Sequence, residues 1–98
     1  MFTSFKERNG IEKVTIFPNP TKNHLIIDFK SNVSGKLNIN LKNILGTNVS
    51  GIYSDNLNSG SNKIMIDLTR LSIKKGIYFA EFIIDEKLFY TEKILVVE

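Results

Sequence analysis

Strict alternation of apolar and polar residues is the clearest pattern in this chain. Between residues 36 and 42 the apolar positions are Leu37, Ile39 and Leu41, and every position between and beside them is Lys or Asn. Side chains of a strand point alternately to its two faces, so a period of two predicts a β-strand with one buried and one solvated face. Ile64, Ile66 and Leu68 repeat the pattern. We therefore expect an all-β protein.

Further short apolar runs recur about every ten residues, with turn-forming residues between them. They cover 14–17, 25–29, 49–53, 77–84 and 88–97. Seven strands at this spacing predict an immunoglobulin-like antiparallel β-sandwich. We expect its core to include, among others, Leu37, Ile39, Leu41, Ile64, Ile66, Tyr78, Phe82 and Ile94.

The segments between the runs carry their own predictions. Pro18 and Pro20 lack backbone donors, so the chain should leave the sheet there. Residues 55–62 are polar and predict an exposed loop, whereas 69–72 predict one helical turn, the only helix expected. The last two runs should form the central hairpin across Asp85-Glu86-Lys87, with a four-residue loop, because Asp-Glu is not a favoured two-residue pair.

The length of 98 residues suits one domain. Residues 1–10 show no sustained period and predict a linker or a remnant of cloning, with the domain spanning 11–98. The start contains no apolar run of signal-peptide length, and no segment approaches the ~18 apolar residues of a membrane span. If the protein is exported, we expect this chain to be a piece of a longer one with an upstream cargo domain.

Composition removes several kinds of chemistry. The chain has no cysteine and one histidine, His24, which excludes thiolate metal sites, cysteine nucleophiles and multi-histidine centres. No nucleophile and base are placed to cooperate, so we expect no enzyme, metal or cofactor. The formal net charge is +3, but lysines are scattered among ten carboxylates. A nucleic-acid binder needs a concentrated basic stripe, so we expect no nucleic-acid partner.

Several motifs follow one another in a characteristic order. They are Ile16 to Pro20, the Leu37 strand with Gly46 and Val49, Gly60 to Leu68, Leu71, Gly76 to Tyr78, and Lys93 to Val97. Together they resemble the C-terminal sorting domain of type IX secretion, over about residues 14–98. Pro-Asn-Pro alone is a weak signal, whereas the ordered set is much stronger. Asn43, and Asn23 with His24, depart mildly from the family's usual turn residues.

The resemblance implies a role and a set of motif residues. Proteins similar to this one cross the outer membrane of Bacteroidota through the type IX translocon, and a sortase-like peptidase often cleaves the domain during surface attachment. The implied location is secreted or cell-surface, and the implied partners are that machinery and the cargo. The sorting positions implied are Pro18, Asn19, Pro20, Gly46, Gly60, Asn62, Asp67, Leu68, Gly76, Tyr78, Lys93, Ile94, Val96 and Val97.

Several motif positions also have a purely structural explanation. Pro18-Asn19-Pro20 can serve as a rigid chain reversal, Gly76 can meet a backbone demand, and Asp67 can accept hydrogen bonds in a turn. The terminal 93–98 can be a final strand, or it can offer its backbone edge to a receptor by strand addition. The alternative function is a carbohydrate- or protein-binding module of a secreted enzyme, which would want clustered exposed aromatics, and tryptophan is absent.

Overall fold

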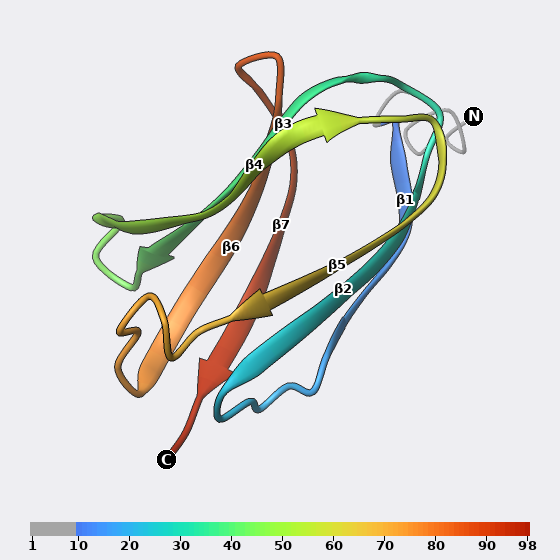
Figure 1. The fold of residues 1–98 in the computed structure, drawn as a ribbon. Coiled ribbons are helices and arrows are strands. Elements are labelled where there is room, and N and C mark those ends of the chain that lie inside the picture. The colour runs from blue at the N-terminus through green and yellow to red at the C-terminus, as the bar shows by residue number, and fades with distance from the viewer. Residues whose placement is uncertain (1–9) are drawn as a thin grey trace, which may run out of the picture.

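The computed structural model describes residues 10–98. It contains seven antiparallel strands in two sheets and, within that range, no helix (Figure 1). The strands are β1 (Ile11–Phe17), β2 (His24–Ser31), β3 (Gly35–Asn43), β4 (Asn48–Leu57), β5 (Gly60–Asp67), β6 (Gly76–Ile84) and β7 (Lys87–Val96). The prediction of an all-β sandwich is confirmed.

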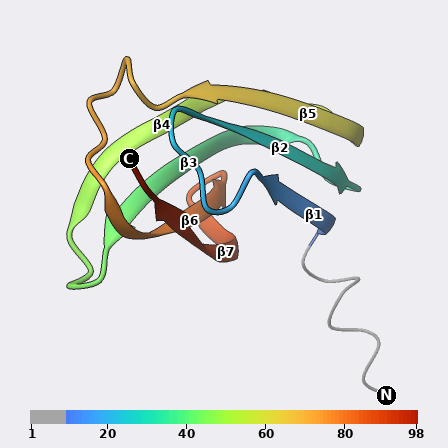
Figure 2. The ribbon, with the colours of Figure 1, turned by 90° about the horizontal axis from the view of Figure 1, so that it is seen from below.

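The two sheets have the orders β1-β2-β5 and β4-β3-β6-β7. They face each other as two layers, with the connections at the ends (Figure 2). In a constant-type immunoglobulin sandwich the fourth strand lies in the same sheet as strands one, two and five. Here β4 pairs with β3 instead, so the two sheets have three and four strands. This leaves β1 and β5 as the edges of one sheet, and β4 and β7 as the edges of the other.

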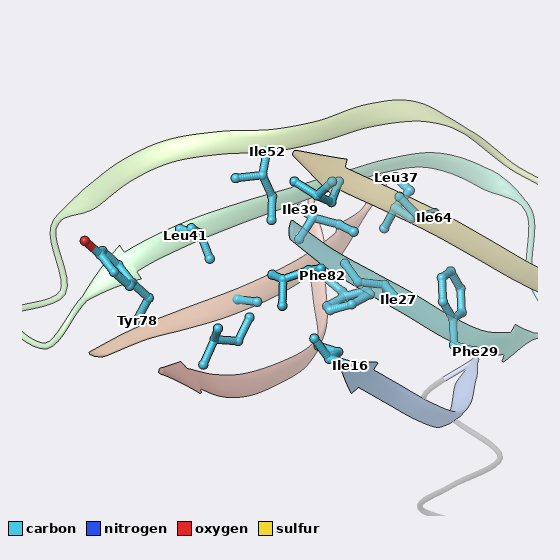
Figure 3. Close-up of a cluster of buried hydrophobic side chains, with 14 of the residues drawn as sticks. Ile16, Ile27, Phe29, Leu37, Ile39, Leu41, Ile52, Ile64, Tyr78 and Phe82 are labelled. Carbon is cyan, nitrogen blue, oxygen red and sulfur yellow. The ribbon is translucent and has the colours of Figure 1, made fainter. Parts of the chain in front are cut away.

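The core lies between the sheets and is filled by the inward side chains of every strand (Figure 3). All eight residues predicted to be buried are buried, none being more than 8% exposed. Phe29 of β2 and Phe82 of β6 bridge the layers, with ring centroids 5.8 Å apart at 85°. Phe82 also meets Tyr90 of β7 edge-on at 5.6 Å. Edge-to-face contacts of this kind add to the energy of burial.

Three connections differ from their predictions in some respect. Residues 55–57 continue β4, because Leu57 is 3% exposed and holds the strand end onto the core, and only Asn58 and Ser59 form the loop. At 69–72, where one helical turn was predicted, Leu71 N donates to Leu68 O and Ser72 N donates to Thr69 O, each at 3.2 Å. Ser72 then adopts a φ of 57°, which ends the turn before a helix can form.

The last hairpin differs from its prediction in two ways. Its loop has two residues, Asp85 and Glu86, with φ of 49° and 71°. Positive φ at both positions is the geometry of a type I′ turn, whose twist matches that of the flanking strands. In addition, β7 lies at the edge of its sheet, so the hairpin is not central.

The domain boundary remains a prediction, because residues 1–9 lie outside the described range. Gly10 is described and is buried, and its carbonyl accepts a hydrogen bond from Asn32 N at 2.9 Å. Within residues 10–98, no helix is long and apolar enough to cross a membrane.

Candidate functional site

One end of the sandwich brings together three segments that are far apart in the sequence. They are the β1–β2 loop (18–23), the β5–β6 loop (68–75) and the last residues of β7. In Figure 1 the β1–β2 loop and the C-terminus lie close together at the lower end of the molecule. We call the surface made by residues 18–23 and 93–97 the motif end, because it joins the first and last motifs of the sequence.

Asn19 joins the two motifs through its side chain. Its Nδ2 donates to the carbonyl of Lys93 at 3.0 Å, and its Oδ1 accepts from the backbone N–H of Leu95 at 3.0 Å. The amide thus bonds to the edge of β7 as the peptide group of a neighbouring strand would. Both flanking bonds, Phe17-Pro18 and Asn19-Pro20, are cis.

Thr21 continues the same contact with its backbone. Its N–H donates to Leu95 O at 2.9 Å, and its carbonyl accepts from Val97 N at 2.8 Å. Thr21 pairs in parallel with Val96 and is 1% exposed. Its hydroxyl is satisfied by donating to the carbonyl of His24. The edge of β7 from Lys93 to Val97 is therefore already occupied.

This occupation corrects one expectation. The terminal strand was considered as a free edge to which a receptor could add a strand, but the carbonyl of Lys93 and the N–H of Leu95 are bonded to Asn19, and Leu95 O and Val97 N to Thr21. An added strand would need these same groups. What remains accessible here is the outer face of the sheet, where Lys93 is exposed and where Ile77 and Leu95, which are cross-strand partners, are 43% and 38% exposed.

One backbone hydrogen bond joins the β5–β6 loop to the motif end, and two further contacts fix the loop itself. Leu68 N donates to Asn23 O at 2.8 Å, and the Leu68 side chain is 1% exposed. The Tyr78 hydroxyl donates to Lys74 O at 2.7 Å while its ring packs in the core, as predicted. Asp67 Oδ1 accepts from Thr69 N and from the Thr69 hydroxyl. The hydrogen bond from the Thr69 hydroxyl is the main reason that the pKa of Asp67 lies below its usual value.

The remaining motif residues are mostly structural neighbours of this end. Gly76 has a φ of 153°, which L side chains rarely adopt, and it pairs with Val96. Ile94 and Val96 point into the core and are 0% and 3% exposed. Gly46 lies in the β3–β4 turn, which begins at Asn43 beside Tyr78. Gly60 and Asn62 do not join them, because they pair with Ser31 and Phe29 at the opposite end of the sandwich.

A basic hollow of about 440 Å³ lies against the motif end. Lys22, Lys74 and Lys75 line it together with Val97 and Glu98. Lys75 Nζ lies 3.9 Å from a Glu98 carboxylate oxygen, a solvent-exposed ion pair of little energetic weight. The hollow is open and charged, and it gives the motif end a positive flank.

Reasoning from the sequence missed Thr21, and it named Asn19 without the contact that its side chain makes to β7. Pro18-Asn19-Pro20 was explained by its prolines, whereas the contacts to β7 come from the residues after each proline. A short polar residue directly following a proline, where the chain leaves a sheet, is a signal that could have suggested a cap for a neighbouring strand edge.

No catalytic grouping is apparent among the residues that the structure describes. Within them no three His, Cys, Asp or Glu side chains come together to hold a metal. His24 is exposed at the start of β2 and faces Asp67 of β5 across the strands. A shallow hollow of about 460 Å³ beside this pair is lined by Asn23, Met65 and Thr69 as well.

Comparison with known proteins identifies the family. The model of the secretion system C-terminal sorting domain matches residues 15–97, which is nearly the whole described chain. The protein therefore belongs to this family, the C-terminal sorting signals of type IX secretion. Such a signal implies export of an attached cargo across the outer membrane to a secreted or cell-surface location. No curated protein and no solved structure shows a significant match.

Proposed function

We propose that this domain acts without catalysis, as a folded export signal that the type IX machinery reads at the motif end. The observation that carries the proposal is the pair of hydrogen bonds from Asn19 to Lys93 and Leu95. Lys93 and Leu95 follow Asn19 by 74 and 76 residues, so these bonds bring two distant motifs into one surface. Only the folded domain can present that surface, so folding and recognition are coupled.

The proposed contact uses side chains of the outer sheet face. With the backbone edge of 93–97 occupied, a receptor can reach the Lys93 ammonium and the exposed apolar pair Ile77 and Leu95. A small apolar patch beside a charge is a common arrangement for a specific protein contact. After translocation, a sortase-like peptidase cleaves the domain from its cargo during surface attachment.

A matched set of variants on β7 tests this proposal in a cargo fusion. Lys93→Glu and Leu95→Ser alter the motif end, while Lys87→Glu and Leu88→Ser make the same changes at the opposite end of the same strand. Leu88 is 58% exposed and Lys87 is exposed, so neither control removes a core residue. We expect the first pair to leave cargo in the periplasm and the second pair to export it normally.

The readout is the ratio of surface to periplasmic cargo, measured beside the melting temperature of each isolated domain. If the motif-end variants keep their fold and still export at the wild-type level, the signal lies elsewhere. If all four variants fail equally, recognition is not confined to this end.

A further inference from the structure

The edge strand β5 differs from the other three edges of the sandwich. It pairs with β2 over all eight of its residues without a register shift. By contrast, β1 has a shift between Glu12 and Thr15, and β4 has two shifts against β3. The end of β7 is covered by Asn19 and Thr21. Bulges and covered edges are the devices that prevent strands of different molecules from pairing.

The outer face of β5 carries a self-complementary pattern. Its exposed side chains include Lys63, Met65 and Asp67, which alternate with the buried Ile64 and Ile66. Met65 is 72% exposed, so this edge presents an apolar side chain between two charged ones. A positive charge stands two residues before it and a negative charge two residues after it. When two copies of this segment run antiparallel about Met65, each charge lies opposite the opposite charge of the other copy.

We propose that two copies of this chain associate through β5, in an antiparallel pair whose two-fold axis passes through Met65. In this register Met65 lies opposite Met65 of the second copy, and Lys63 of each copy lies opposite Asp67 of the other. On the inner face Ile64 lies opposite Ile66. Directly opposed side chains in an antiparallel pair have Cβ atoms about 4.5–5.5 Å apart, close enough for both ion pairs and the Met65 contact.

Charge and backbone geometry select this register. In this register the numbers of two facing residues are both odd or both even. Residues whose N–H and C=O groups point away from the sheet therefore face each other, as an antiparallel ladder requires. In the proposed register the numbers of two facing residues add up to 130. If the pair slides so that they add up to 132 or 128, Met65 lies opposite Asp67 or Lys63 and both ion pairs are lost. If they add up to 134 or 126, Asp67 lies opposite Asp67 or Lys63 opposite Lys63 of the second copy. Like charges directly opposite each other are destabilising.

The surroundings of β5 also suit a second copy. A hollow of about 280 Å³ lies between the edges β4 and β5, lined in part by Ile52, Tyr53 and Leu71. Leu71 is 37% exposed there. Asp67 and Arg70 also line this hollow. In Figures 1 and 2, β5 forms the outer margin of its sheet, and no other described strand lies beyond it. A second copy paired to β5 would cover this margin and extend the sheet to six strands.

Charge reversal tests the proposal on the 98-residue chain, with mass measured by sedimentation velocity. The wild type should form a dimer of twice its 11.2 kDa mass. Lys63→Glu alone and Asp67→Lys alone each place like charges opposite, and each should weaken the dimer about tenfold. A 1:1 mixture of these two variants restores both ion pairs between unlike copies. It should associate as the wild type does, and the double variant should also self-associate.

Lys87→Glu is the matched control, because it reverses a lysine on another edge strand and should leave the dimer unchanged. Export of a cargo fusion carrying Lys63→Glu should also be unchanged, since the pairing is independent of the sorting role. A wild-type chain that is monomeric at about 1 mM, where even weak edge pairing is populated, would overturn the proposal. So would single variants that stay dimeric, or a mixture that fails to associate although each variant folds.

A second measurement covers the case in which Asp67→Lys fails to fold, since Asp67 accepts two hydrogen bonds from Thr69. The chain has no cysteine, so Met65→Cys introduces a single thiol on the proposed axis. A short bismaleimide should cross-link this variant to itself much faster than it cross-links Lys87→Cys. Lys63→Cys should cross-link to Asp67→Cys in a mixture but poorly to itself. Equal rates for all of these would overturn the register and the proposal.

Discussion

The side chain of Asn19 bonds to the backbone on both sides of residue 94, donating to Lys93 O and accepting from Leu95 N, each at 3.0 Å. One side chain thus ties the first connection of the chain to its last strand.

Asn19→Asp should detach the β1–β2 loop from β7. The carboxylate keeps an acceptor for Leu95 N but turns an oxygen toward the Lys93 carbonyl, and we expect a cost of about 1 kcal/mol because the site is exposed. Hydrogen exchange at Thr21 and Val97, whose amides bond across this contact, should accelerate. Asn62→Asp is the control, because Asn62 Nδ2 also donates to backbone carbonyls, at the other end. Unchanged exchange at Thr21 would contradict the expectation.

Phe82→Ala should destabilise the domain by about 3–5 kcal/mol, because it removes a wholly buried ring that contacts both Phe29 and Tyr90. For a domain of this size the loss is comparable to the total stability. Urea unfolding followed by circular dichroism measures it. Phe79→Ala, at a half-buried position on the other face of the same strand, should cost clearly less. Equal losses would argue against the layer-bridging role of Phe82.

Glu86→Gly should stabilise the domain by about 1 kcal/mol. Glu86 has a φ of 71°, and a side chain in this region costs energy that glycine avoids. Asp85 is kept in this variant, because its Oδ1 accepts from Lys36 N at 3.0 Å. Thermal unfolding measures the gain. Lys87→Gly, one position further and inside β7, should instead lower the melting temperature, and a gain in both variants would show that the turn geometry is not the cause.

Stability should decline in alkali through Tyr90. Partial burial, and then the hydrogen bond and the charge of Glu92, raise the pKa of Tyr90 to about 12 from 10.0. The folded state therefore keeps this proton after the unfolded state has lost it, so the free energy of unfolding falls as the pH rises from about 10 to about 12. Tyr90→Phe should lack this part of the decline. Unfolding curves of both proteins at pH 9 and 11 provide the comparison, and parallel changes would contradict it.

Deleting 93–98 should leave a fused cargo in the periplasm, but this loss alone does not locate the signal. The deletion removes Ile94 and Val96, which are 0% and 3% exposed, and should therefore also unfold the domain. Lys93→Glu separates the two effects, because this exposed side chain should change stability by no more than about 0.5 kcal/mol. A truncated fusion that reaches the surface with its fold intact would remove the terminal strand from the signal.

Much of the candidate site was visible in the sequence as ordered motifs, but their spatial relation was not. The separation of Gly60 and Asn62 from the motif end follows from the strand pairing β2–β5, which spacing along the chain does not encode. The docking of Asn19 on β7 could not be predicted either. Side-chain hydrogen bonds between residues more than 70 positions apart depend on the final packing and leave no periodic trace.

The sequence by itself determined the strands and their buried faces, because the alternation at Leu37, Ile39 and Leu41 is a local property of a half-buried strand. Tertiary structure decided where β4 lies, that β7 forms an edge, and that Asp85 and Glu86 take a two-residue turn. These choices depend on how two twisted sheets close over one core, a balance among contacts distant in sequence. The residues next to a given position in the chain do not determine these long-range contacts.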